Sequence, residues 1–304
     1  MASSTACRLA SYSVATGANS LVRKAIGAHM NDLKFQQRWL VATWRPMPTC
    51  ASGTAYTRCA IPTAPPRICG SGADRYRWEF RLREDETADT YGTLSALYPL
   101  IRPWVEQVAV DELELVRVAG YTFRAQVATH WRQSNMFILG DAAHLTPPFI
   151  GQGLCAGLRD AVNLAWKLAG VINGWLAEAV LDSYEAERKP HARNLIRFAL
   201  AVGAAMTAGG RAGDLLRRIV VPPRLHLIPG VRDKIVDSAT PPLRGSELVI
   251  RSLRLRQLAG TLCPNPLMLD GKRFDEIVGQ RFAVVTAVPL NLLNAMTWIA
   301  QARW

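Results

Sequence analysis

The chain has 304 residues and a formal net charge of +12, from 36 Lys and Arg against 24 Asp and Glu. Hydrophobic residues make up 49% of it and charged residues 20%, which is typical of a globular protein with a sizeable core and excludes bulk disorder. No apolar run reaches the ~18 residues that a transmembrane helix needs, and the first residues do not resemble a signal peptide.

The basic residues are scattered and form no dense block interleaved with aromatic residues. A solvated basic surface is therefore favoured over nucleic-acid binding, which stays a weak alternative. The six cysteines include no CxxC pair, and their spacing suits neither a zinc site nor a disulfide framework. We expect reduced thiols in a cytoplasmic protein, with no metal and no membrane partner.

The N-terminal part predicts short elements separated by loops. Residues 11–27 predict a short strand, a glycine turn and a helical turn that carries Arg23. Residues 37–45 predict another strand. Residues 50–74 are rich in Pro, Gly, Thr and Ala and predict a loop.

The next segment alternates between apolar and polar residues. Residues 75–82 predict a half-buried antiparallel strand, with the arginines and Glu79 on one face. The other face carries Tyr76, Trp78, Phe80 and Leu82. A helix is predicted over 93–109, two strands with a break near Gly120 over 112–130, and a short apolar strand over 136–140.

From Gly153 onward the apolar residues follow helical spacing. A second helix is predicted over 178–197, interrupted at Pro190. Residues 198–220 also predict a helix. Residues 259–285 begin a new region, with a hairpin-like LDGKRFDEIVG followed by the strand RFAVV.

Residues 136–169 contain the pattern that carries chemistry. A buried strand ends at Gly140–Asp141, where the carboxylate can accept hydrogen bonds from a ribitol or ribose hydroxyl. Pro147–Pro148 stiffen a tight loop, and Gly151 and Gly153 then open a long helix with free N–H groups. This helix end favours negative charge by up to ~1 kcal/mol, which suits the anionic form of a reduced flavin.

Each feature alone has a simpler explanation, because Asp often caps a strand end and Gly-x-Gly often opens a helix. The whole string MFILGDAAHLTPPFIGQGLCAGLRDAVNLAWKLA closely resembles the FAD-dependent aromatic-ring hydroxylases of the para-hydroxybenzoate hydroxylase type. Within that family it is most similar to the 3-(3-hydroxyphenyl)propionate hydroxylases. The resemblance covers roughly residues 12–285 and is strongest over 136–197.

The resemblance implies an enzyme that uses FAD, with NADH or NADPH as a transient reductant. One oxygen atom of O2 would enter the ring of a small phenolic aromatic acid, and no metal is needed. The basic surroundings would suit a carboxylated phenol. The resemblance identifies no catalytic base, and the oligomeric state is left open.

The resemblance also assigns residues to FAD. Asp141 would bind the ribityl chain, Pro147–Pro148 would line the isoalloxazine ring, and Gly151–Leu154 would present backbone N–H groups to flavin N1 and O2. Asp160 and Asn163 would hold the helix and loop in place. The assigned residues are Arg23, Gly140, Asp141, Pro147, Pro148, Gly151, Gln152, Gly153 and Leu154. Structural roles, explained by amphipathic spacing, are favoured for His144, Trp166 and Lys167.

A second FAD motif of the family, Asp-Gly-x-x-Ser-x-x-Arg, is similar to residues 16–27. Gly17, Ser20 and Arg23 match it, whereas Thr16 stands where the family has an acidic residue. On the later strands, the candidates to face the substrate are Tyr121 and Phe123. Ordinary sheet packing explains those two aromatic residues equally well.

The fold class that follows is α/β (α+β). It combines an incomplete doubly wound FAD-binding domain, an inserted mixed or antiparallel substrate-binding sheet and a partial thioredoxin-like start. The predicted ranges are 1–40 for a remnant of the FAD-binding domain, 41–125 for the substrate-binding sheet, 126–210 for the flavin-ring part of the FAD-binding domain, 211–258 for a helical linker and 259–304 for the thioredoxin-like part.

The GxGxxG unit that seats the FAD pyrophosphate in this family has no counterpart in the sequence. A non-catalytic remnant without stable FAD is therefore an alternative to an active hydroxylase. We also expect low solubility, because a parallel sheet that lacks central strands exposes edges and apolar faces.

Overall fold

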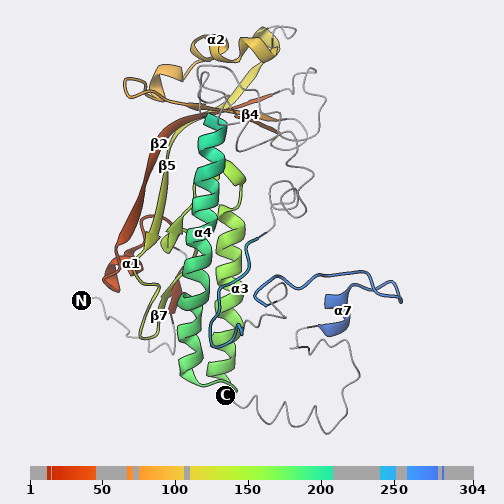
Figure 1. Cartoon of the computed structure of the whole chain (residues 1–304). Coiled ribbons are helices and arrows are strands. Elements are labelled where there is room, and N and C mark those ends of the chain that lie inside the picture. The colour runs from red at the N-terminus through yellow and green to blue at the C-terminus, as the bar shows by residue number, and fades with distance from the viewer. Residues whose placement is uncertain are drawn as a thin grey trace, which may run out of the picture. The chain divides into compact units, whose positions relative to one another are not determined.

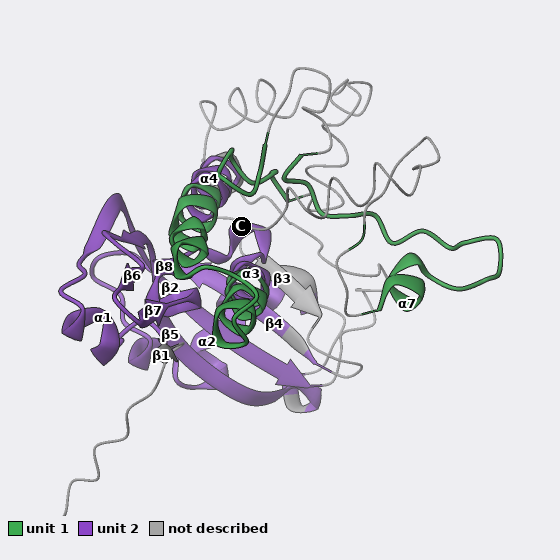
Figure 2. Ribbon diagram, turned by 90° about the horizontal axis from the view of Figure 1, so that it is seen from below, with its two compact units in different colours: residues 1–11, 160–191, 240–304 green, residues 12–159, 192–239 purple. Residues whose placement is uncertain are grey.

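The computed structural model describes residues 12–14, 16–45, 67–70, 75–105, 110–207, 240–250, 259–279 and 283. The chain divides into two compact units, which Figure 2 shows in different colours. Unit 2 contains residues 12–159 and 192–239, and unit 1 contains residues 1–11, 160–191 and 240–304. The divisions fall within two helices, α3 (Gly153–Ile172) and α4 (Asp182–Thr207).

The larger sheet of unit 2 is built on two long antiparallel strands (Figure 1). These are β2 (Met30–Arg45) and β5 (Glu114–Ala128). The strand order is β3-β4-β2-β5-β8, with neighbours antiparallel. The remaining strands are β3 (Arg67–Gly70), β4 (Tyr76–Arg81) and β8 (His144–Leu145). This arrangement agrees with the antiparallel sheet expected between the FAD-related segments.

The smaller sheet of unit 2 has the order β1-β7-β6. Strands β1 (Tyr12–Val14) and β7 (Met136–Ile138) are parallel, whereas β6 (Arg132–Gln133) is antiparallel to β7. Helix α1 (Leu21–Ala25) follows β1 after a turn at Gly17, whose φ is +75°. The short strand, glycine turn and helical turn predicted over 11–27 are confirmed.

A hydrophobic core lies between the larger sheet and helix α2 (Leu94–Val105). The alternation predicted for β4 is confirmed, because Trp78 is buried in this core and its ring packs edge-on against Trp44 at 6.2 Å. The opposite face of β4 is less exposed than its polar sequence predicts. Glu79 is only 2% exposed there, because its carboxylate pairs with the Arg77 guanidinium at 2.8 Å. The short 3-10 helices near this core are η2 (Asp89–Tyr91) and η3 (Val110–Glu112).

Strand β5 runs through Gly120 without interruption, so the break predicted near that glycine is wrong. Gly120 pairs with Leu40 in the middle of the ladder. A Cβ atom on Gly120 would lie 3.0 Å from the Ala88 Cβ. The glycine therefore allows close packing of a neighbouring segment and does not end the strand.

Helix α4 also continues where the sequence predicts an interruption, since Pro190 lies inside it. Proline removes one backbone hydrogen bond, but tertiary packing on both sides of that turn outweighs the loss. The helix predicted over 198–220 is confirmed as far as Thr207, and the rest lies outside the described residues. Part of the predicted loop 50–74 is instead strand β3, because it pairs with β4.

Unit 1 contains the second half of α3, the 3-10 helix η6 (Glu178–Leu181) and the first half of α4. Its segment 259–279 includes an isolated bridge between Leu267 and Arg273, so a turn lies at the start of the hairpin-like stretch LDGKRFDEIVG. The second half of that stretch is helix α7 (Phe274–Val278), so the hairpin prediction is wrong there. The strand predicted at 281–285 lies outside the described residues except for residue 283. None of the helices among the described residues is long and apolar enough to span a membrane.

Candidate functional site

The segment from β7 to α3 connects the two sheets of unit 2. After β7 it forms the 3-10 helix η4 (Gly140–Ala142), strand β8 and the 3-10 helix η5 (Pro148–Ile150) before α3 begins. Strand β8 pairs with β5, and the Ala128 N–H donates to the Ala143 carbonyl at 2.7 Å. The loop predicted to hold the flavin ring therefore begins at a hydrogen-bonded strand, β8, and ends at helix α3.

Arg23 brings the two sequence motifs together. Its guanidinium donates to the Ala18 carbonyl at 2.6 Å and to the Ala142 carbonyl at 2.9 Å, and the side chain is buried. The first acceptor lies in the turn before α1, and the second lies next to Asp141. Burial lowers the pKa of the Arg23 guanidinium, while the two carbonyl dipoles compensate its charge locally.

The turn before α1 is closed by side-chain hydroxyls. Ser20 caps the helix, because its Oγ accepts a hydrogen bond from the Arg23 backbone N–H at 3.1 Å. The Thr16 hydroxyl donates to the same Oγ at 2.7 Å. The threonine that replaces the acidic residue of the family motif thus takes part in the turn without adding a negative charge.

Two glycines set the distance between η4 and helix α3. A Cβ atom on Gly157 would lie 3.3 Å from the Gly140 Cα, and Gly140 itself has a φ of +58°. The absence of a side chain at 157 lets the helix backbone lie close to the loop that carries Asp141, and a Cβ there would require a shift of a few tenths of an ångström. Sequence analysis did not single out Gly157, although a glycine inside a helix is a signal of close backbone approach.

We predict that Gly157→Val lowers the free energy of unfolding by roughly 1–3 kcal/mol, because the added methyl groups must push α3 away from η4. Gly157→Ala should be close to neutral, since better helix propensity offsets the tight contact. Urea denaturation measures both, with Ala186→Val on an exposed site of α4 as the control for the propensity of valine. Equal stability of Gly157→Val and the wild type would contradict the close-approach role.

The N-terminus of α3 provides an environment suited to an anionic group. Gly151 has a φ of +66°, and a Cβ built on it would meet no atom within 4 Å. The first turn of α3 contains no acidic residue, and the first N–H groups of a helix have no acceptor within the helix. Asp141, in η4 shortly after β7, is exposed. The segment from Asp141 to the first turn of α3 thus combines an accessible carboxylate, space beside Gly151 and helix N–H groups that have no acceptor within the helix.

The other predicted cofactor residues lie on the same segment. Pro147 is buried and Pro148 is half-buried, and the Pro148 carbonyl accepts a hydrogen bond from the Gly151 N–H at 3.1 Å. Gln152 accepts a hydrogen bond from Arg159 at 3.3 Å. Gly153 is half-buried, while the Leu154 side chain is 77% exposed. Within the described ranges, no cluster of His, Cys, Asp and Glu could hold a metal ion.

A series of aromatic rings connects this segment to the larger sheet. The Phe149 ring packs edge-on against Phe35 at 5.7 Å and Trp39 at 6.1 Å. Trp39 in turn contacts Phe123 at 6.0 Å, and Phe123 stacks on Tyr121 at 6.2 Å. Tyr121 and Phe123, the two predicted substrate residues, therefore belong to one aromatic cluster with the flavin-loop segment. The connection runs through Trp39 and Phe149, which sequence analysis did not name.

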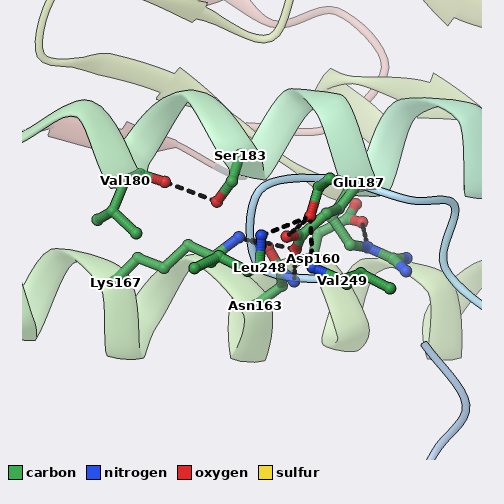
Figure 3. A network of polar contacts seen from close by, with 10 residues as sticks. Asp160, Asn163, Lys167, Val180, Ser183, Glu187, Leu248 and Val249 are labelled. Carbon is green, nitrogen blue, oxygen red and sulfur yellow. Dashed lines mark hydrogen bonds and ion pairs between the residues drawn. The ribbon is translucent and has the colours of Figure 1, made fainter. Parts of the chain in front are cut away.

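A buried polar network fixes the second half of α3 (Figure 3). Lys167 pairs with Glu187 of α4 at 2.8 Å, and both side chains are almost fully buried. Asn163 bridges them, accepting from Lys167 at 2.9 Å and donating to Glu187 at 2.8 Å. Ser246 donates to the other carboxylate oxygen of Glu187 at 2.7 Å. Burial lowers the pKa of Lys167, and its hydrogen bond to Glu187 opposes that shift.

A second buried pair lies one turn away from this network. The Arg188 guanidinium donates to the Asp160 carboxylate at 2.8 Å, and both side chains are buried. Burial raises the pKa of the neighbouring Tyr184 well above its usual value, and the Asp160 charge adds to the effect. Asp160 and Asn163 were expected to hold the helix and loop, and they contact α4.

The FAD binding domain family model matches residues 9–199, which is more than half of the chain. The chain therefore belongs to this family, that of the FAD-dependent aromatic-ring hydroxylases. It is 33% identical over 282 residues to a 3-(3-hydroxy-phenyl)propionate/3-hydroxycinnamic acid hydroxylase of Burkholderia cenocepacia (strain HI2424). That match covers 91% of the chain and 51% of the relative. A Rhodococcus jostii (strain RHA1) protein named "Probable NADH-specific resorcinol 4-hydroxylase" is 35% identical, over 63% of the chain and 35% of the relative. The chain thus spans about half the length, or less, of these relatives.

Solved structures share the fold. The rebeccamycin biosynthetic enzyme RebC with reduced flavin superposes with a TM-score of 0.73 at 21% identity, over 96% of this chain and 58% of that one. Aklavinone-11 hydroxylase, solved with FAD and aklavinone, gives a TM-score of 0.69 at 23% identity, over 89% of this chain and 51% of that one. The mixed architecture of helices and antiparallel sheet is therefore shared with these two enzymes.

Proposed function

We propose that the chain carries the flavin-ring and substrate-facing parts of an FAD-dependent monooxygenase that hydroxylates a phenolic aromatic acid. The observation that supports this most directly is the Arg23 bridge, because it joins the two FAD-related motifs through the Ala18 and Ala142 carbonyls. Residues 1–40 and 126–210 would form the cofactor-binding part. Residues 41–125 would form the substrate-binding sheet.

The residues present are suited to the ring and ribityl end of FAD. Asp141 would accept a hydrogen bond from a ribityl hydroxyl, and Pro147–Pro148 would line the isoalloxazine ring. Backbone N–H groups of Gln152–Leu154 would face the pyrimidine edge of the ring, where a helix N-terminus favours negative charge, whereas the Gly151 N–H already donates to the Pro148 carbonyl. When bound, FAD supplies the redox and oxygen-activating chemistry, with NADH or NADPH as the reductant.

On the substrate side, this chain would orient an aromatic ring and exclude water. Tyr121 is 42% exposed and stacks on Phe123, so its outer face can take a planar ligand. The formal net charge of +12 favours the approach of a carboxylate. The names of the Burkholderia relatives point to 3-(3-hydroxyphenyl)propionate as the first compound to test.

Visible absorption of the purified chain tests the proposal. We expect flavin bands that persist after gel filtration, a change of these bands on adding 3-(3-hydroxyphenyl)propionate, and a product heavier by one oxygen atom in the presence of NADH or NADPH and O2. A colourless chain that takes up no added FAD would favour the non-catalytic remnant. Salt-sensitive retention of DNA by a colourless chain would favour the nucleic-acid alternative.

Asp141→Asn is expected to weaken FAD binding by about 10- to 100-fold, because a hydrogen bond to a charged acceptor contributes roughly 1.5–3 kcal/mol. Fluorescence titration of added FAD measures the dissociation constant. Asp182→Asn is the matched control, because Asp182 is also an exposed carboxylate, at the start of α4, and this variant should bind FAD like the wild type. If FAD affinity falls equally in the two variants, Asp141 is not part of the FAD site.

A further inference from the structure

The Phe149 ring is enclosed by three segments of unit 2. This residue follows the proline pair of the predicted flavin loop, and it is only 2% exposed. Phe35 and Trp39 of β2 pack edge-on against the ring at 5.7 Å and 6.1 Å. The backbone of Gly203, in the last turns of α4, lies against another part of the ring. The flavin loop, the larger sheet and α4 therefore meet at this one side chain.

The contact with Gly203 leaves no room for a side chain at that position. A Cβ atom built on Gly203 would lie 2.8 Å from the Cγ atom of Phe149 and closer still to its Cδ2 and Cε2 atoms. Cβ atoms in folded proteins essentially never approach another heavy atom to less than 3.0 Å. Cγ lies at the base of the ring, so rotation of the ring does not relieve the contact. Gly203 is buried inside a helix, where glycine is less favourable than alanine, and the space that the ring occupies explains the glycine.

The far side of the ring is also held in place. Trp39 is 1% exposed, packs against Phe123 at 6.0 Å, and donates from its Nε1 atom to the Gln37 side chain at 3.1 Å. Close-packed interiors transmit a displacement because they contain few voids that could absorb it. A side chain at 203 would therefore move the loop that carries Phe149, since the sheet side of the ring cannot make room.

Movement of the ring would carry a short, stiff piece of chain with it. Pro147 and Pro148 precede Phe149 and have fixed φ angles. The Pro148 carbonyl accepts a hydrogen bond from the Gly151 N–H at 3.1 Å, which closes the turn around Phe149, and α3 begins at Gly153. In the proposed FAD site, this is the segment beside the isoalloxazine ring.

We propose that Gly203 is a positioning residue for the flavin. It leaves the space in which the Phe149 ring sits, and the ring sets the position of residues 147–151 beside the isoalloxazine ring. Gly203 contacts no cofactor atom in this arrangement and acts through Phe149. The inference rests on the proposed function, because it concerns the same cofactor site. A side chain at 203 should therefore change both the affinity for FAD and the environment of the bound ring.

Hydrogen exchange of the chain without FAD tests the effect on the loop. Gly203→Val should speed amide exchange over residues 149–156 by about tenfold or more, because the displaced ring no longer holds the loop closed. Ala204→Val places the same side chain on the next, exposed residue of α4 and should exchange like the wild type. Gly203→Ala supplies the same test with a single methyl group if Gly203→Val does not fold. Exchange over 149–156 that is unchanged in the folded Gly203 variant would overturn the proposal.

FAD titration of the same variants distinguishes positioning from packing alone. Gly203→Val should raise the FAD dissociation constant by about tenfold or more and shift the absorption maximum of the FAD that remains bound. Phe149→Leu/Gly203→Val, in which a smaller side chain makes room for the valine, should bind FAD more tightly than Gly203→Val. Faster exchange with wild-type FAD affinity and absorption, or a double variant that binds no better than Gly203→Val, would overturn the positioning role.

Failure of the proposed function gives a different result. A wild-type chain that takes up no FAD would overturn the proposed function and the role of Gly203 towards the cofactor together. Normal FAD binding by Gly203→Val would overturn the role of Gly203 alone. The wild type and Ala204→Val, measured beside it, distinguish these two results.

Discussion

Lys167→Met is expected to lower the free energy of unfolding by about 3–5 kcal/mol, the cost of breaking a buried ion pair by removing one partner. The loss is large because the Glu187 carboxylate, 2% exposed, would keep its charge with no cation beside it. The hydrogen bonds from Asn163 and Ser246 compensate only part of that charge. Chemical denaturation followed by circular dichroism measures the change.

A double-mutant cycle separates the pair from its surroundings. Glu187→Gln removes the charge and keeps a group that can bond to Ser246, so Lys167→Met/Glu187→Gln should be more stable than Lys167→Met alone. Lys189→Met is the control, because Lys189 pairs with Glu185 on the same helix with 22% and 28% of the side chains exposed. It should cost no more than about 1 kcal/mol. If Lys167→Met and Lys189→Met lower the free energy of unfolding equally, the buried pair has no special role in stability.

Arg23→Met is expected to lower the free energy of unfolding by about 2–4 kcal/mol, because two charge-assisted hydrogen bonds are lost and the buried Ala142 carbonyl loses a donor. The bridge between the turn at Ala18 and the loop at Ala142 would disappear. If the proposed FAD site is correct, the FAD dissociation constant should also rise by at least tenfold.

Lys24→Met is the matched control for this change. Lys24 is the next residue on the same short helix, is also basic and is exposed. It should retain stability within about 0.5 kcal/mol of the wild type, as is usual for surface substitutions. A variant Arg23→Met that loses stability but binds FAD normally would confine Arg23 to a structural role.

Periodic segments were predicted well because their local pattern and their tertiary environment agree. The alternation of Tyr76–Arg81 and the helical spacing from Gly153 each correspond to the element found. The FAD-related segment was also predicted from local features, since a strand end, a proline pair and glycines each act over a few residues. Its cofactor role stays a proposal that the Asp141 and Arg23 variants test.

The errors arose where tertiary packing overrode a local signal. Gly120 usually suggests a break, but the pairing with β2 along the whole ladder keeps β5 continuous. Pro190 usually interrupts a helix, but α4 is held by buried contacts such as the Lys167–Glu187 pair. The buried state of Glu79 could not be read from β4 either, because it depends on the adjacent strands and on Arg77.

The sequence by itself determined the family and led to the proposed FAD segment, because contiguous motifs specify strand ends, turns and helix starts. Only the tertiary structure revealed the Arg23 bridge, the Gly140–Gly157 contact and the aromatic cluster around Phe149. These features join residues far apart in the chain, and the spacing of residues along one sequence does not contain that information.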